Sequence, residues 1–506
     1  MTTQGVKKWM AQVAAEWLAF AMIIIGAILR LRQYFHCRSL WVDEADLALD
    51  IIKYPMQAMT GPFANNQAAP PAFMAATKIV TSIFGTSEYA FRLLPMLASI
   101  GALFLIRSLA RRFLSPWAVA AAVGLFALNP QAIRYANEFK QYSGDIFSCI
   151  AILLTADLYA AGRIKPLFFA MLGAVIVWFS HPSVFVLAAA GSCVMLQSLL
   201  QKNWRAARIT AVCIAAWLAS FAVLYEIALT RIRHDSYFST SSLWSAGYLP
   251  WPWNSGRAFK WLKNTFIEFT GLGLAPPEHS FTGSRIVMSI AAILILISVA
   301  CRLRTNRHSL YLLAMPAVIA FAAAVMHSYP FMNRLIVFLI PVVVLLIADG
   351  LDVLFLHRER IPMLAKLIGV AAMLIHPAAM RCMEFKEPLE CEEIRPLMRI
   401  MARQRQPGDA IYVYYAAKEA FEFYSPRFGF TSSDVVQGLR WRKEPKHYLE
   451  DLLQFRGRPR RWVIFSHPVL HEDRFILHTL DQWGRQISQR QTTGASLHLY
   501  DLTAKP

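Results

Sequence analysis

Apolar runs of about 20 residues recur along this chain from residue 14 to residue 380, and this is the length at which a helix crosses the hydrocarbon core of a bilayer. The chain is 56% hydrophobic and only 16% charged. A soluble protein of that composition would expose large apolar patches to water. The sequence therefore predicts an α-helical polytopic membrane protein.

The basic residues predict how the spans are oriented. The net charge is +19, but the Lys and Arg residues form short clusters between apolar runs, which is typical of cytoplasmic loops and argues against nucleic-acid binding. Lys7 and Lys8 precede the first run, so we expect a cytoplasmic N-terminus. The later clusters then give about eleven alternating spans. These are residues 12–31, 89–108, 116–132, 146–161, 166–180, 183–200, 209–228, 285–300, 309–326, 335–352 and 362–380.

The predicted membrane domain, residues 1–380, carries its long loops on the external side. The main external loops are residues 32–88, 134–145 and 229–284. Within the first of them, the apolar segment 72–84 is too short for a span and contains Lys78, which favours an interfacial helix.

Residues 381–506 have the composition of a small extracytoplasmic α/β domain. The turn Pro407-Gly408-Asp409 precedes the first apolar strand pattern. We expect strands at 411–415, 462–465 and 497–500, and helices at 419–424, 448–455 and 474–482. Cys382 and Cys391 would lie on the same external side, and the sequence leaves a disulfide between them open.

Four acids, Asp43, Glu44, Asp46 and Asp50, fall within eight positions directly after the first span, in a chain with only 32 acids. Two interpretations stay open. Asp43 as the N-cap of a helix, with Asp46 at the third helical position, resembles a capping box. Alternatively, the acids face an external site where chemistry takes place.

A second acidic segment reaches the same side of the membrane in the loop 134–145. On a continuous helix, Glu138, Tyr142 and Asp145 share one face. The simpler alternative is an ion pair between Glu138 and Arg134, four residues apart. Carboxylates at membrane depth are costly and usually mark a cavity, and paired carboxylates suit acid–base chemistry or metal binding.

Taken together, these motifs resemble those of membrane glycosyltransferases with a GT-C fold, in the family 39-like group that includes bacterial protein mannosyltransferase and lipid A aminoarabinose transferase relatives. The motifs are Trp41-Val42-Asp43-Glu44, Pro70-Pro71, Phe84-Gly85-x-x-Glu88-x-x-x-Arg92-Leu93, Tyr135-x-x-Glu138-x-Lys140-x-Tyr142 and Tyr329-Pro330-x-x-x-Arg334. Relatives often carry Lys or His just before the Pro-Pro pair, where this chain has Ala69, so Gln67 is the nearest polar substitute.

The resemblance implies inverting transfer of a sugar from a polyprenyl-phosphate donor to an envelope acceptor, which is a lipid, a polysaccharide or a protein. The site would face the outside of the bacterial cytoplasmic (inner) membrane, with the C-terminal domain in the periplasm. Asp43 would be the catalytic carboxylate, assisted by Glu44 and Glu138. A divalent cation, if one takes part, would use Glu138 and His181. The implied substrate-binding residues are Lys140, Tyr142, Asp145, Arg334, Gln67 and Tyr329.

A multi-span transporter or flippase of a lipid-linked glycan is the rival interpretation, and a non-catalytic scaffold with a sensor domain is a third. Transporters usually show internal repeats and broken helices at the membrane midplane. This chain shows no repeat, and its acids cluster in loops on one face. The sequence therefore favours the enzyme.

Overall fold

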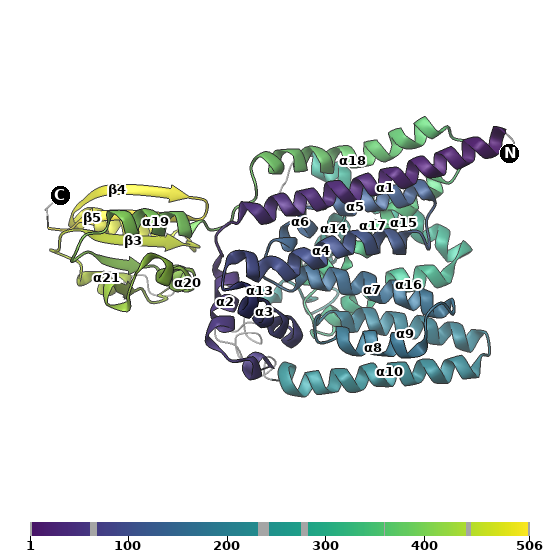
Figure 1. Cartoon of the computed structure of the whole chain (residues 1–506), viewed down its shortest axis with the longest axis horizontal. Coiled ribbons are helices and arrows are strands. Elements are labelled where there is room, and N and C mark those ends of the chain that lie inside the picture. Colours follow the sequence, from purple (N-terminus) through teal and green to yellow (C-terminus); the bar gives the residue numbers. More distant parts are fainter. Residues whose placement is uncertain are drawn as a thin grey trace.

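The computed structural model describes residues 3–60, 68–230, 242–274, 282–358, 360–441 and 447–503. Figure 1 shows a bundle of long helices and, beyond one end of it, a smaller part that contains a β-sheet. The N-terminus lies at the end of the bundle that is far from this sheet. The predicted fold class, a helical membrane domain followed by a small α/β domain, is confirmed.

The bundle is built from helices of very different lengths. In chain order they are α1 (Thr3–His36), α2 (Val42–Lys53), η1 (Met56–Thr60), α3 (Pro71–Phe84), α4 (Glu88–Ala110), α5 (Pro116–Ala127), α6 (Pro130–Ala136), α7 (Tyr142–Ala160), α8 (Pro166–Ile176), α9 (Ser183–Leu200), α10 (Trp204–Leu224), η3 (Tyr225–Leu229), α13 (Ser242–Ser245), α14 (Gly256–Gly271), α15 (Thr282–Thr305), α16 (Arg307–Val325), η4 (Asn333–Leu339), α17 (Ile340–Leu351), η5 (Asp352–Leu356) and α18 (Met363–Lys386).

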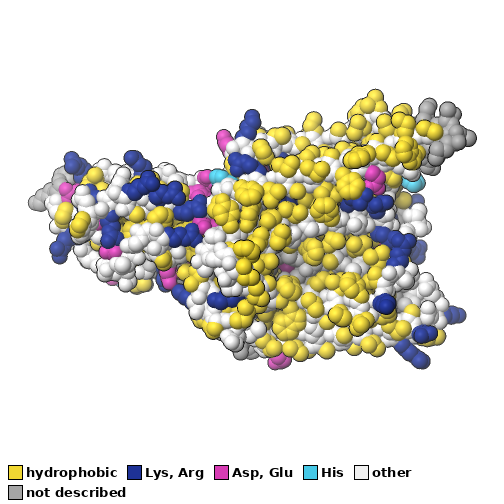
Figure 2. Space-filling model, in the orientation of Figure 1, with side chains coloured by type: hydrophobic (Ala, Val, Ile, Leu, Met, Phe, Trp, Pro, Cys, Tyr) yellow, Lys and Arg dark blue, Asp and Glu magenta, His cyan; other side chains and the backbone are white. Residues whose placement is uncertain are grey.

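Within the described residues, nine helices are long and apolar enough to cross a membrane, and α5 with α6 makes ten if that bent pair is one span. The predicted span 166–180 corresponds to α8, which has only 11 residues, about half of what a span requires. The predicted interfacial helix is α3, with 14 residues. Figure 2 shows hydrophobic side chains covering the middle of the bundle surface, as lipid contact requires.

The predicted span 116–132 corresponds to α5 and α6, between which the chain bends by 52°. The side chain of Asn129 accepts a hydrogen bond from the backbone N–H of Ala132 and so caps α6. Pro130 then occupies the first turn, where a missing N–H costs nothing. α6 leads into the turn 137–141, in which the backbone N–H of Phe139 donates a hydrogen bond to Glu44 of α2.

Two helices form the centre of the bundle. α5 and α17 are buried along nearly their whole length. Both are apolar in sequence, apart from Asp349 of α17, which pairs with Arg302. The other spans pack around them and keep apolar side chains on the outside.

The C-terminal domain contains one five-stranded sheet of order β2-β1-β3-β5-β4. Its elements are α19 (Ile394–Gln404), β1 (Ala410–Val413), η6 (Tyr415–Ala417), α20 (Lys418–Phe428), η7 (Ser432–Asp434), β2 (Val435–Gln437), α21 (His447–Leu453), β3 (Arg461–Ser466), α22 (Glu472–Trp483), β4 (Arg485–Thr492) and β5 (Ala495–Asp501). β1 pairs in parallel with β2 and β3, whereas β5 is antiparallel to β3 and β4. The three predicted strands and three predicted helices are present. β2 and β4 were not predicted.

The C-terminal domain docks on the bundle through a buried carboxylate. Glu88, at the start of α4, accepts hydrogen bonds from Arg395 (2.6 Å), Arg427 (2.8 Å) and the Tyr424 hydroxyl (2.9 Å). Figure 1 shows α2 and α3 at the end of the bundle nearest to this domain. All seven cysteines lie in the described part of the chain and all are free, including the Cys382 and Cys391 whose pairing the sequence left open.

Candidate active site

Asp43 is the second residue of α2, at the end of the bundle that faces the C-terminal domain. Trp41 is the N-cap of this helix and makes no side-chain capping bond. The interpretation of Asp43 as the N-cap is therefore wrong, because Asp43 is a residue of the helix and Trp41 occupies the N-cap position. The Asp43 carboxylate instead forms an ion pair and a hydrogen bond with the guanidinium of Arg334, from η4.

Arg334 connects Asp43 to two aromatic rings. Its guanidinium carbon lies 6.0 Å from the ring centre of Tyr142 and 5.8 Å from that of Trp244. Tyr142 in turn packs edge-on against Tyr135, with 4.8 Å between ring centres. Segments distant in sequence thus meet around one cation, and cation–π contacts of this kind hold its orientation.

The Asp43 side chain is 20% exposed and that of Arg334 is 29% exposed, so a substrate has access to both. Burial by itself would raise the pKa of Asp43, but the positive charges of Lys140 and Arg334 outweigh it and hold that pKa below its ordinary value. Asp43 is therefore ionised at neutral pH. Lys140 lies in the turn 137–141 with a side chain that is almost fully buried, and burial lowers its pKa.

Glu44, the next residue, has an entirely different environment. It is fully buried, and Arg92 donates two hydrogen bonds to it, of 2.8 Å and 2.6 Å. The backbone N–H of Phe139 donates a third, of 2.6 Å. Glu44 thereby ties α2 to α4 and to the turn 137–141, which carries Lys140. This carboxylate, which the sequence predicted to assist Asp43, is thus buried and bound by protein groups.

Glu138 is buried between two arginines, with an oxygen 3.6 Å from nitrogens of both Arg38 and Arg134. The predicted single helical face of Glu138, Tyr142 and Asp145 is wrong, because residues 137–141 form a turn and α7 begins at Tyr142. The simpler alternative, the Glu138–Arg134 ion pair, is present. Burial raises the pKa of Glu138, against the opposing charge of Arg38.

The remaining predicted residues lie in different surroundings. Asp145 is buried in the first turn of α7. The Tyr329 hydroxyl donates to the carbonyl oxygen of Leu335 at 2.8 Å, and its ring packs edge-on against Phe185. His181 lies between α8 and α9, and burial lowers its pKa to about 4. Gln67 lies outside the described residues.

A divalent cation does not fit the residues that the sequence proposed for it. Across the described ranges, no group of three or more His, Cys, Asp or Glu side chains is placed to hold a metal ion. Glu138 is held by two arginines instead, an environment that repels a cation.

Sequence reasoning missed Arg38, Glu392 and His467. Arg38 contacts both Glu44 and Glu138. Glu392 accepts a hydrogen bond from the backbone N–H of Val42, and His467 lies close enough to act on the charge of Asp43. Arg38 lies just before the acidic motif in the sequence, and this closeness could have identified it. The other two follow Asp43 by more than 300 residues, and no local pattern marks them.

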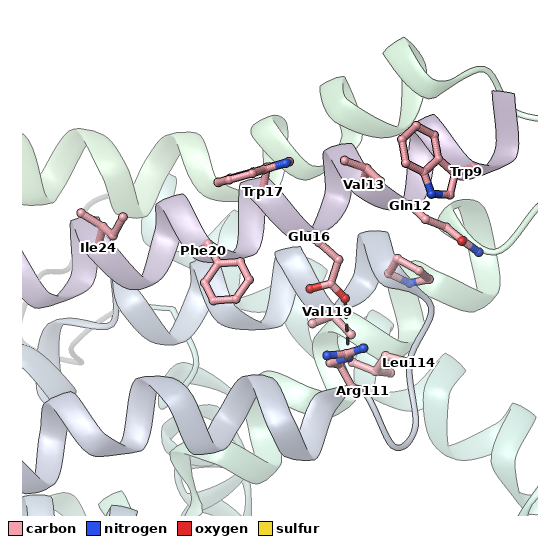
Figure 3. Close-up of a pocket in the computed structure, with 11 residues that line it drawn as sticks. Trp9, Gln12, Val13, Glu16, Trp17, Phe20, Ile24, Arg111, Leu114 and Val119 are labelled. Atoms are coloured by element: carbon pink, nitrogen blue, oxygen red, sulfur yellow. Dashed lines mark ion pairs between the residues drawn. The ribbon is translucent and has the colours of Figure 1, made fainter. Parts of the chain in front are cut away.

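A separate cavity of about 820 Å³ lies at the other end of the bundle, and it is not this site. It is lined by the N-terminal half of α1 and by residues near the α4–α5 connection, including Trp17, Glu16 and Arg111. Figure 3 shows Glu16 directed toward Arg111, with Phe20 on the same side of α1.

No family model and no curated protein matches the sequence, so the comparison depends on solved structures. ArnT from Cupriavidus metallidurans in the apo state superimposes with a TM-score of 0.52 at 15% identity, covering 95% of this chain and 98% of that one. The same protein bound to undecaprenyl phosphate gives 0.53 at 13% identity, covering 96% and 98%. The Archaeoglobus fulgidus oligosaccharyltransferase in the apo form gives 0.51 at 11% identity, covering 96% of this chain and 74% of that one. The chain thus has the fold of the GT-C membrane glycosyltransferases.

Proposed function

We propose that this protein is an inverting glycosyltransferase that moves a sugar from a polyprenyl-phosphate donor to an envelope acceptor. The observation that carries the proposal is the ionised, accessible carboxylate of Asp43, paired with Arg334 and within reach of the charge of Lys140. The likeness of the whole chain to a GT-C protein whose structure holds undecaprenyl phosphate supports the donor class.

In the proposed reaction, an acceptor hydroxyl attacks the anomeric carbon of the donor sugar from the side opposite the phosphate. The new carbon–oxygen bond forms as the bond between the anomeric carbon and the phosphate oxygen breaks. The electron pair of the broken bond leaves with the polyprenyl phosphate. Asp43 accepts the hydrogen bond of the attacking hydroxyl and receives its proton. The configuration at the anomeric carbon inverts.

Two cations balance the charge that the leaving phosphate acquires. Arg334 and Lys140 come from separate segments, η4 and the turn 137–141, so a phosphate placed between them would be held from two sides. Charge-assisted hydrogen bonds to phosphate are the strong class, and cations positioned in advance stabilise charge as it develops. Arg334 would exchange part of its contact with Asp43 for the phosphate.

The proposed location is the bacterial inner membrane, with the N-terminus cytoplasmic and the C-terminal domain periplasmic. Figure 2 shows Lys and Arg side chains gathered at the end of the bundle away from the C-terminal domain, as the positive-inside tendency requires of a cytoplasmic face. In this orientation the site faces outward, where lipid-linked sugars are the available donors. Membrane lipids would surround the bundle.

The Asp43→Asn variant tests the function. Mass spectrometry of the envelope from a deletion strain, compared with strains carrying wild-type protein, identifies the glycosylated product. We expect complementation by Asp43→Asn to leave that product absent, because the amide cannot receive the proton. The purified variant should keep its thermal stability and should still bind undecaprenyl phosphate.

Asp434→Asn is the matched control. Asp434 is also paired with an arginine, Arg405 at 2.9 Å, and its side chain is 19% exposed, but it lies in the C-terminal domain away from Asp43. This variant should restore the product fully. Wild-type product levels from Asp43→Asn would refute the catalytic assignment, and an envelope unchanged by the deletion would favour the transporter or scaffold interpretation.

A further inference from the structure

The C-terminal domain reaches the first turn of α2 through Glu392. One carboxylate oxygen of Glu392 accepts a hydrogen bond from the backbone N–H of Val42, at 3.1 Å. Val42 is the first residue of α2 and directly precedes Asp43. The first N–H groups of a helix have no partner within it, and a carboxylate there is favoured by the helix dipole. Glu392 therefore fixes the backbone from which Asp43 projects.

The other oxygen of Glu392 binds His467, whose Nδ1 lies 2.7 Å away. Glu392 is almost fully buried, whereas the His467 side chain is 44% exposed. His467 follows the end of β3 and has a φ of +54°. Non-glycine residues rarely adopt this left-handed conformation, and where they do it is often at functional sites. Through Glu392, the imidazole is connected to the start of α2.

Lys140, Arg334 and the protonated form of His467 each lower the pKa of Asp43, and these three residues come from three parts of the chain. Lys140 belongs to the turn 137–141, Arg334 to η4 and His467 to the C-terminal domain. The acids near this group are Glu138 and Asp46, which also act on Lys140. A donor phosphate would draw on Lys140 and Arg334, whereas Glu392 keeps His467 in place.

We propose that Glu392 and His467 are positioning residues for Asp43, supplied by the C-terminal domain: Glu392 fixes the start of α2, and the imidazolium of His467 balances the Asp43 carboxylate while the other two cations hold phosphate. The inference rests on the proposed function. It assigns to the C-terminal domain a direct part in assembling the site, beyond its attachment to the bundle.

Two substitutions at His467 separate charge from structure. Asn tolerates the left-handed backbone but carries no charge, and Lys restores a positive charge. In the complemented deletion strain, we expect His467→Asn to lower the envelope product about 10- to 100-fold, the scale of effect produced by small displacements of reacting groups. His467→Lys should return most of it. Glu392→Gln should lower the product as well, because it loses the charge that holds His467.

His471→Asn is the matched control, because His471 lies in the same domain with a similar φ of +60° and should give wild-type product. Purified His467→Asn should bind undecaprenyl phosphate and unfold thermally as the wild type does. Full product from His467→Asn would overturn the proposal, as would equal losses in the Asn and Lys variants at unchanged stability. Product from Asp43→Asn would instead refute the proposed function.

Discussion

Asp43 and Glu44 are neighbours in sequence and have opposite environments. The Asp43 side chain is 20% exposed and paired with one arginine, whereas the Glu44 side chain has no exposed surface and accepts three hydrogen bonds. The sequence predicted related roles for both. What separates them is the distant partner of each, Arg334 and Arg92, and local pattern does not reveal which arginine reaches which acid.

Lys140 predicts a pH dependence for donor binding. Burial lowers its pKa below the ordinary 10.5, so its ammonium loses a proton as pH rises through that lower value. We expect the affinity for undecaprenyl phosphate to fall as pH rises, and to fall at a lower pH than the titration of an exposed lysine would produce. Titrating the purified protein with undecaprenyl phosphate at a series of pH values measures this.

Lys140→Arg is the check on that assignment, because arginine stays charged across the whole range. Its binding affinity should lose this decline with rising pH. The same decline in Lys140→Arg would show that another group is responsible.

At the scale of elements, the long apolar helices were predictable because hydrophobic length is a local property. The break at Asn129-Pro130 was not predicted, although an N-cap residue followed by proline is a helix start, because apolar residues continue on both sides of it. β2 has only three residues. β4 has the sequence RQISQRQT and lies at the sheet edge with mostly exposed or half-buried side chains, so it lacks the apolar alternation that marks a strand.

The cap of α6 is testable through Asn129. Its amide nitrogen donates to the carbonyl oxygen of Leu272 at 2.7 Å while its oxygen caps the helix. Asn129→Ala removes both bonds at a buried position, and we expect it to lower the free energy of unfolding by roughly 2–4 kcal/mol, the sum of a lost cap and an unsatisfied carbonyl. Thermal unfolding in detergent measures the loss.

Asn203 provides the comparison, because it caps α10 by accepting from Ala206 and is exposed. Asn203→Ala should cost about 1 kcal/mol or less, the value of a cap alone. Equal losses in the two variants would mean that the Leu272 bond contributes nothing.

At the scale of the whole molecule, Glu88 is one of the buried groups that join the two parts. Glu88→Gln leaves Arg395 and Arg427 without their buried counter-charge, and breaking a buried pair from one side is strongly destabilising. We expect faster proteolysis between α18 and α19 and loss of the envelope product, because Glu392 and His467 would leave α2. Cleavage rates of the purified protein, followed by mass spectrometry, test the first part.

Glu422→Gln is the control variant for this experiment. Glu422 also joins the two parts, pairing with Lys53 at 2.8 Å, but both side chains are about half exposed. Exposed pairs contribute little, so cleavage should stay at the wild-type rate. If Glu88→Gln behaved in the same way, the docking would depend on packing and not on this carboxylate.

The ion pair between Asp43 and Arg334 joins residues 291 positions apart, and this separation sets an order for biosynthesis. At translation rates of roughly 5–20 residues per second, the ribosome needs about 15–60 s after making Asp43 before Arg334 exists. His467 is made later still. During that interval Asp43 has no Arg334 to pair with, whereas Glu44 needs only the 48 further residues that bring Arg92. A polypeptide released early by a nonsense codon would therefore insert its first helices and still contain no assembled site.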